Sequence, residues 1–250
     1  MKLLESAFND IEELYGKGSL ERVRQMIADN TSRRMAGQEE AKWVLPGLST
    51  EPWLNKNSFD LKFESAIVEL EGNSQDIIAE FNQVKHNILI RPYEHYLGKY
   101  DNWNGIYLFK DGEWMPESDS HFRRSKNILS ECLGGQLCPL LEVHFSILDP
   151  KSSIPLHCDL WNFTLNLHLG INIPPDCYIS VNGETRGWEA GKTLLFDYSF
   201  QHEAWNDSSL PRTCLLMDIW HPELSVPEKY ALTYFVKYLR EQTTLTTESH

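Results

Sequence analysis

The stretch Phe163–Ile173 (FTLNLHLGINI) alternates apolar residues with threonine, asparagine, histidine and glycine along its whole length. A period of two is typical of a β-strand whose faces meet different surroundings. Solvent is the usual neighbour of such a polar face. Here the face carries Asn166 and His168 and directly follows His157 and Asp159, so we favour the interpretation that it lines a cavity.

The stretches on either side repeat the strand pattern. Leu141–Leu148 alternates in the same way, Asn182-Gly183 indicates a tight hairpin, and Lys192–Phe196 and Arg212–Trp220 are predicted to be buried strands. Short strands separated by turn signals, without helices between them, are typical of a β-sandwich or a jelly roll. The C-terminal half is therefore predicted to be an all-β core of one of these two kinds.

The first part of the chain is predicted to be helical. Leu4, Phe8 and Ile11 recur at helical spacing, residues 16–18 (GKG) interrupt the pattern, and Ser19 is expected to cap a second helix. This hairpin carries no visible chemistry, and we expect it to serve packing or the docking of a partner.

Three further elements are predicted between the hairpin and the strands. Ser65–Leu89 has a helical pattern that Gly72-Asn73 is expected to divide, and Asp111-Gly112 indicates a hairpin. Phe122–Leu133 has a more helical pattern.

Composition and charge limit the binding partners and the cellular location that we expect for this protein. The formal net charge is −13, and no cluster of lysine or arginine offsets it, so nucleic acid is not an expected partner. The five cysteines are odd in number and lack zinc-ribbon spacing, and the N-terminus has a charged helical pattern instead of a signal peptide. No apolar run approaches the roughly 20 residues of a membrane span. We expect a cytoplasmic protein.

His157 and Asp159 are two residues apart, so on an extended segment both side chains point to the same side. With His202 from a later strand they would complete a facial triad of two histidines and one carboxylate, the ligand set of many Fe(II) oxygenases. Taken singly, each is more often a surface or capping residue. Arg212 follows His202 by ten positions and would supply the cation that the far carboxylate of a chelating keto acid needs.

Around these residues the sequence resembles the aspartyl/asparaginyl β-hydroxylase family, over roughly Leu45–Leu224. The resemblance implies a double-stranded β-helix (jelly-roll, cupin-like) core. It also implies Fe(II) as cofactor and 2-oxoglutarate and O2 as co-substrates. The motifs that carry the resemblance are Ser146–Pro150 (SILDP), Ile154–His157 (IPLH), His168–Gly170 (HLG), Gly191-Lys192 (GK), Phe196–Glu203 (FDYSFQHE) and Asp218–Leu224 (DIWHPEL).

Position by position, the resemblance makes His157 and His202 the iron-binding histidines. Arg212 becomes the main partner of the 2-oxoglutarate carboxylate. The remaining implied co-substrate residues are Ser146 and His168, which would hydrogen-bond it, and Trp103, which would lie near the pocket.

Two positions depart from the animal members of the family. Asp159 stands where those members have glycine, so this chain has a complete triad. Asn166 stands where they place an arginine that holds an acidic substrate side chain. Further candidate substrate residues are Trp161, with packing as its alternative, and Arg123 and Arg124, for which a solvated helix face is the alternative.

We therefore predict a mainly β protein with N-terminal helices. Residues 1–44 would form the helical hairpin and linker, and residues 45–250 the double-stranded β-helix oxygenase domain with flanking helices. The expected activity is hydroxylation of an amino-acid or peptidyl residue, of the Asp/Asn β-hydroxylation type or another, with release of succinate and CO2. Two alternatives stay open, namely a hydroxylase of a small-molecule or lipid intermediate and a catalytically silent jelly-roll binding protein. Halogenation is disfavoured because Asp159 would occupy the halide position. The oligomeric state is left open by the sequence.

Overall fold

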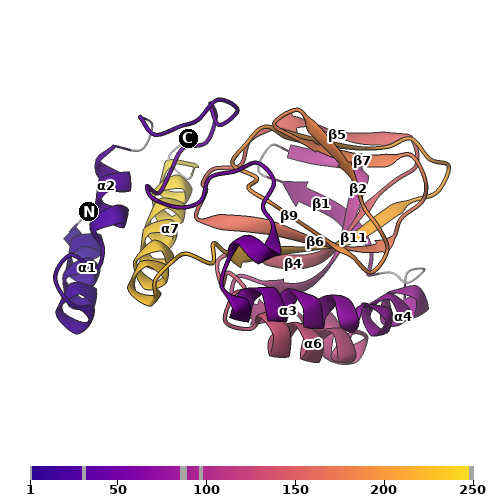
Figure 1. The fold of residues 1–250 in the computed structure, drawn as a ribbon, viewed down its shortest axis with the longest axis horizontal. Coiled ribbons are helices and arrows are strands. Elements are labelled where there is room, and N and C mark those ends of the chain that lie inside the picture. The colour runs from indigo at the N-terminus through magenta and orange to yellow at the C-terminus, as the bar shows by residue number, and fades with distance from the viewer. Residues whose placement is uncertain (1, 30–31, 85–88, 96–97, 248–250) are drawn as a thin grey trace.

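Two antiparallel sheets face each other in the computed structural model, which describes residues 2–29, 32–84, 89–95 and 98–247 (Figure 1). The strands are β1 (Arg91–His95), β2 (Gly98–Lys110), β3 (Glu113–Trp114), β4 (Glu142–Leu148), β5 (Ser152–His157), β6 (Thr164–Asn172), β7 (Cys177–Val181), β8 (Glu184–Gly187), β9 (Thr193–Phe196), β10 (His202–Asn206) and β11 (Arg212–Trp220).

The strand order identifies the architecture. The larger sheet runs β1-β2-β4-β11-β6-β9, with β3 paired to β2, and the smaller sheet runs β5-β10-β7-β8. From β4 onward the chain crosses repeatedly between the two sheets, which is the winding of a jelly roll. The predicted mainly β fold with a jelly-roll core is confirmed.

Helices cover the outer face of the larger sheet, and others gather at one end of it (Figure 1). α3, α4 and α6 lie beneath the sheet, while α1, α2 and α7 form the separate group at the end. None of the helices in the described part of the chain is both long and apolar enough to cross a bilayer. The helices are α1 (Lys2–Tyr15), α2 (Glu21–Ala28), α3 (Leu61–Gly72), α4 (Ser74–Val84), α5 (Pro116–Ser120), α6 (Arg123–Leu133) and α7 (Val226–Thr247), with a 3₁₀ turn at Lys56–Ser58.

The alternating strands of the larger sheet turn their apolar side chains toward these helices. Leu167 of β6 and Met217 of β11 pair in register and are fully buried, in one cluster with Phe81 of α4 and Leu129 of α6. Because successive side chains of a strand point to opposite faces, the polar rows of β4 and β6 face the smaller sheet. These rows therefore face the cavity, as favoured for Phe163–Ile173, and not solvent.

The helical predictions were correct in kind and less accurate at the helix ends. The division at Gly72-Asn73 is confirmed, since α3 ends at Gly72 and α4 begins at Ser74. α3 begins at Leu61, where the Asp60 side chain accepts a hydrogen bond from the backbone N–H of Phe63. Residues 85–88, in the predicted helical tail, lie outside the described residues. The Ser19 cap is wrong, because α2 begins at Glu21 and its N-cap residue makes no side-chain hydrogen bond.

The N-terminal hairpin packs against α7, which the sequence analysis did not predict. Phe8 of α1 and Met26 of α2 are buried in one cluster with Phe235 of α7. At the edge of this cluster, Arg22 Nε lies 2.7 Å from Glu228 Oε1. The apolar face of the hairpin is thus covered within the chain.

Candidate metal centre

His157 and His202 lie side by side on neighbouring strands of the smaller sheet. His157 ends β5 and His202 begins β10, and the two are cross-strand partners. Their ring centroids are 4.1 Å apart. The pairing of β5 with β10 thus brings together two histidines that are far apart in the sequence.

A nearby backbone carbonyl fixes the protonation of each histidine ring. His157 Nδ1 lies 2.7 Å from the carbonyl oxygen of Pro155, and His202 Nδ1 lies 2.9 Å from that of Phe200. A carbonyl only accepts, so each Nδ1 carries the proton and each Nε2 presents a lone pair. Burial lowers the pKa of His157, which favours the neutral form that a metal ligand requires.

Asp159 completes the cluster just beyond the end of β5. Its Oδ2 lies 3.6 Å from His202 Nε2 and 4.0 Å from His157 Nε2. The three candidate ligand atoms all lie within 4.8 Å of one another. Bonds of about 2.0–2.2 Å from each residue to one ion would span the two measured separations.

The electrostatics of Asp159 also suit a bound cation. Burial, and then the nearby charge of Glu142, raise its pKa to about 8. A divalent ion would favour the charged carboxylate because ligands bind metal in their deprotonated form. The residues present therefore fit a metal ion held by two histidines and one carboxylate.

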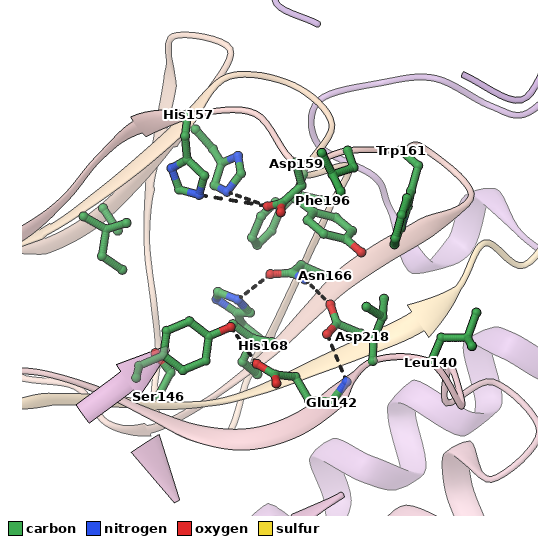
Figure 2. Close-up of a pocket in the computed structure, with 18 of the residues that line it drawn as sticks. Leu140, Glu142, Ser146, His157, Asp159, Trp161, Asn166, His168, Phe196 and Asp218 are labelled. Atoms are coloured by element: carbon green, nitrogen blue, oxygen red, sulfur yellow. Dashed lines mark hydrogen bonds and ion pairs between the residues drawn. The ribbon is translucent and has the colours of Figure 1, made fainter. Parts of the chain in front are cut away.

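These side chains open into a cavity of about 830 Å³ between the two sheets. Figure 2 shows His157 and Asp159 on one side of it and Ser146, His168 and Glu142 on the other. The structure brings together nearly all of the residues that the sequence singled out. The predicted residues that line the cavity are His157, Asp159, His202, Arg212, Ser146, His168, Trp103, Asn166 and Trp161.

Arg212 is a buried cation without a carboxylate partner. Its side chain is 1% exposed and lies over the Trp188 ring, with Cζ 4.6 Å from the centroid. Nη1 donates to Cys214 Sγ at 2.8 Å and to the backbone oxygen of Ser146 at 3.4 Å. Within the described residues, Nε has no hydrogen-bond partner and no carboxylate lies within ion-pair distance. A buried, uncompensated guanidinium is costly, so this geometry suits an anionic ligand such as a dicarboxylate.

Ser146 and Trp103 lie beside this cation. Trp103 Nε1 on β2 donates to Ser146 Oγ on β4 at 2.9 Å, and Arg212 Nη1 is 3.5 Å from the same oxygen. The hydroxyl is therefore held facing the guanidinium.

His168 is held between two side chains. Trp188 Nε1 donates to His168 Nδ1 at 3.2 Å, so the ring proton sits on Nε2, which lies 3.2 Å from Asn166 Oδ1. Burial, and then the charge of Arg212, hold the pKa of His168 well below its usual range. The ring is thus neutral and fixed in one orientation.

Trp188 reaches His168 because a glycine allows the backbone to approach. A Cβ at Gly170 would lie 2.1 Å from the carbonyl oxygen of Glu189. Gly170 N–H donates to Lys192 O at 3.0 Å, and Gly191 N–H donates to Gly170 O at 2.8 Å. The sequence analysis missed Trp188, although a glycine inside an alternating strand indicates such an approach.

The candidate substrate residues divide into two groups. Asn166 and Trp161 line the cavity, and Trp161 Nε1 also donates to Thr164 Oγ1 at 2.8 Å. Arg123 and Arg124 do not reach it, because they lie exposed on α6 at the outer face of the larger sheet. Arg124 Nε pairs there with Asp76 at 2.9 Å. These two arginines thus lie outside the cavity, on the solvated helix face that was the alternative.

Sequence reasoning also missed several other polar residues that line the cavity, among them Tyr93, Glu142 and Asp218. Glu142 stood in the alternating pattern of its strand, and Asp218 stood in a motif of the family resemblance. Neither signal indicated that the two would meet.

A family model described as "Aspartyl/Asparaginyl beta-hydroxylase" matches residues 71–222 of this chain. The aspartyl/asparaginyl beta-hydroxylase of Mus musculus is 30% identical over 189 residues, which are 74% of this chain and 25% of that protein. Aspartate beta-hydroxylase domain-containing protein 2 of Homo sapiens is 28% identical over 211 residues, 79% of this chain and 54% of that protein. This chain thus corresponds to about a quarter and about half of the length of these relatives.

A solved oxidoreductase of the 2OG-Fe(II) oxygenase family from Burkholderia pseudomallei is also similar. It has a TM-score of 0.39 and 12% identity, covering 58% of this chain and 78% of that one. The match of the family model spans both histidines, Asp159 and Arg212. The chain belongs to the aspartyl/asparaginyl beta-hydroxylase family.

Proposed function

We propose that this chain is an Fe(II)- and 2-oxoglutarate-dependent dioxygenase that hydroxylates an amino-acid or peptidyl residue. One juxtaposition carries the proposal. A cluster of two histidines and a carboxylate, with ligand atoms within 4.8 Å of one another, shares a cavity with a buried arginine that has no anionic partner among the described residues. A ferrous ion and a keto-diacid need these two features together.

Each group has a defined task in this proposal. His157, Asp159 and His202 hold the ion on one side of the cavity. Fe(II) with bound 2-oxoglutarate supplies the activation of O2 for hydroxylation, with release of succinate and CO2.

Arg212 pairs with the far carboxylate of 2-oxoglutarate, and Ser146 Oγ adds a hydrogen bond to it. The resemblance implied a hydrogen bond from His168 to the co-substrate, but Trp188 and Asn166 engage both of its ring nitrogens, so the neutral ring would pack beside the co-substrate. The indole rings of Trp103 and Trp188 exclude water from around the guanidinium, which strengthens its pairing with an anion.

Two finer points belong to the same proposal. A cytoplasmic location is supported by the five cysteines, all of which are free thiols. A free small molecule is the second candidate substrate class, because the cavity of about 830 Å³ lies within the range of small-molecule sites.

Anaerobic reconstitution tests the proposal in two stages. Fe(II) binding is measured first by metal analysis after desalting, and 2-oxoglutarate is then added. We expect the visible charge-transfer absorption of a chelated keto acid, which reports binding without turnover. Aerobic succinate formation is measured next, with candidate amino acids and peptides screened for a product heavier by one oxygen atom. A protein that binds Fe(II) but gives neither the absorption nor succinate would instead be a silent jelly-roll binding protein.

A further inference from the structure

The cavity has an acidic end in addition to its Arg212 end. Glu142 on β4 and Asp218 on β11 both line the cavity, and Figure 2 shows them together, below and beside Asn166. The register pairs Met217 with Val143, so Asp218 stands opposite Glu142 across the strands. Asp218 is six residues from Arg212 along β11, about 20 Å at roughly 3.3 Å per residue.

Among the described residues, both carboxylates accept hydrogen bonds only from neutral donors. Asp218 Oδ1 accepts from Asn166 Nδ2 at 2.7 Å, and Oδ2 accepts from the backbone N–H of Glu142 at 3.3 Å. Glu142 Oε1 accepts from the Tyr93 hydroxyl at 2.6 Å. His144 Nδ1 lies 3.3 Å from the same oxygen, but burial lowers the pKa of His144 to about 3, so this ring is neutral.

Lys110 and Arg240 also line the cavity, and each contacts another side chain. Lys110 Nζ lies over the Tyr107 ring, 4.7 Å from its centroid, and Arg240 Nη1 pairs with Asp111 Oδ1 at 2.7 Å. In the part of the chain that the structure describes, no lysine or arginine nitrogen lies within 4.0 Å of either carboxylate. Burial raises the pKa of Glu142 and of Asp218. The charges of Lys110 and Arg240 lower the pKa of Glu142 without reversing this shift, and no cation of the described chain acts on Asp218 in the same way.

Asn166 is held between two neighbours. One of its two amide N–H groups donates to Asp218, and its carbonyl oxygen accepts from His168, as the tautomer above requires. A substrate carboxylate at this place would lie against two further carboxyl groups, whereas a substrate cation would favour their charged form.

A separate observation indicates that the cavity holds a ligand. Arg212 Nε, in a side chain 1% exposed, has no partner among the described residues and lies at the other end of the same cavity. The cationic end therefore suits the anionic co-substrate, and the acidic end is left for the second reactant.

We propose that Glu142 and Asp218 select a substrate that carries a cationic group, an ammonium or a guanidinium, and that Asn166 positions Asp218 for this contact. The inference rests on the proposed function, since it assumes that the second reactant occupies this cavity. It assigns the substrate as a basic amino acid or a basic residue of a peptide, and not an aspartyl residue.

Matched amino acids test the charge requirement without turnover. Ligand-observed NMR on the purified chain with saturating 2-oxoglutarate compares arginine with its neutral analogue citrulline, and lysine with norleucine. We expect at least one cation to bind roughly ten-fold or more tightly than its neutral analogue. Equal binding within both pairs, absence of binding by both cations, or tighter binding of aspartate than of asparagine would overturn the proposal.

Variants then assign the effect to the acidic end. Glu142→Gln keeps an oxygen for the Tyr93 hydroxyl, so it is expected to fold and to lower the preference for the cation by about ten-fold. Asp218→Asn is a second variant of the same kind. Glu113→Gln removes an exposed carboxylate of β3 outside the cavity and should leave the preference unchanged. An undiminished preference in both cavity variants would refute the role of these carboxylates.

The two proposals fail in different ways. Loss of the proposed function would appear as absent Fe(II) or 2-oxoglutarate binding, which the tests in the preceding section detect directly. Failure of the substrate inference would leave those signals intact while the cationic and neutral amino acids bind alike.

Discussion

The two sheets that enclose the cavity fix their functional side chains in different ways. On the smaller sheet, His157 and His202 are each oriented by a carbonyl only two residues earlier in the chain. On the larger sheet, Asp218 is held by Asn166, 52 residues away, and by the backbone of Glu142, 76 residues away. The candidate metal ligands are thus oriented locally, and the candidate recognition groups are oriented by strand register.

The first prediction concerns the locally oriented sheet and has the largest expected effect. His202→Ala removes one of three candidate ligands, so Fe(II) binding should fall by more than the roughly 10- to 100-fold typical of losing an outer partner. Metal analysis and an Fe(II) titration measure the loss. His121→Ala removes an exposed histidine outside the cavity and is the matched control. Undiminished Fe(II) binding would exclude His202 as a ligand.

The second prediction concerns the larger sheet. Arg212→Ala should weaken 2-oxoglutarate binding by about 2 to 5 kcal/mol, the range for truncating a buried charge pair. Fe(II) binding should stay unchanged, because Arg212 is not among the candidate ligands. Titration of the charge-transfer absorption gives the affinity, and Arg124→Ala on α6 is the exposed control. An unaltered affinity would remove Arg212 from the proposed role.

The third prediction tests how far the smaller sheet depends on its carboxylate. Asp159→Gly should weaken Fe(II) binding by about 1 to 3 kcal/mol, the scale of one contact to a charged group, because both histidines remain. The fall should be smaller than for His202→Ala when both are titrated side by side. Retained succinate formation would show that two histidines suffice in this chain.

The fourth prediction uses pH to probe His144 on the larger sheet. It is fully buried, its pKa is lowered to about 3, and neither ring nitrogen has a hydrogen-bond partner among the described residues. The unfolded chain binds a proton near the ordinary pKa of about 6.5 while the folded chain does not. The free energy of unfolding should therefore fall by about 1.4 kcal/mol per pH unit as pH drops from 6.5 toward 3.

Urea unfolding at several pH values measures this slope against a His144→Phe variant, in which it should be absent. Asp197 changes the free energy of unfolding with pH in the opposite direction. Burial raises its pKa to about 7, so its contribution to stability is lost as pH rises from about 4 to 7. Because both proteins contain Asp197, the difference between their slopes isolates His144. Equal slopes would contradict the buried neutral state.

The contrast between the sheets also explains what the sequence could and could not predict. The alternation in Phe163–Ile173 predicted strand β6 and its cavity-facing row, because periodicity is a local property. The spacing of His157 and Asp159 and the later His202 indicated three residues that the structure brings together. Asp218 lies opposite Glu142 because β11 pairs with β4, and the spacing of residues along the sequence does not reveal which strands pair or in which register.

Other misses have the same origin. α7 was missed because its packing on the N-terminal hairpin joins the two ends of the chain. Arg123 and Arg124 were assigned by charge alone, and charge does not reveal which side of a sheet a helix covers. The domain boundary near residue 44 and the chemical roles of the cavity residues stay predictions.

Gly170 has a consequence for any attempt to redesign this cavity. The position has no chemistry of its own, yet the lack of a side chain there lets Trp188 lie against both His168 and Arg212. Adding one methyl group would push the loop outward and loosen both residues at once, although neither had been changed. Redesign of the Arg212 end of the cavity must therefore keep the close approach of Gly170 to Glu189 unchanged.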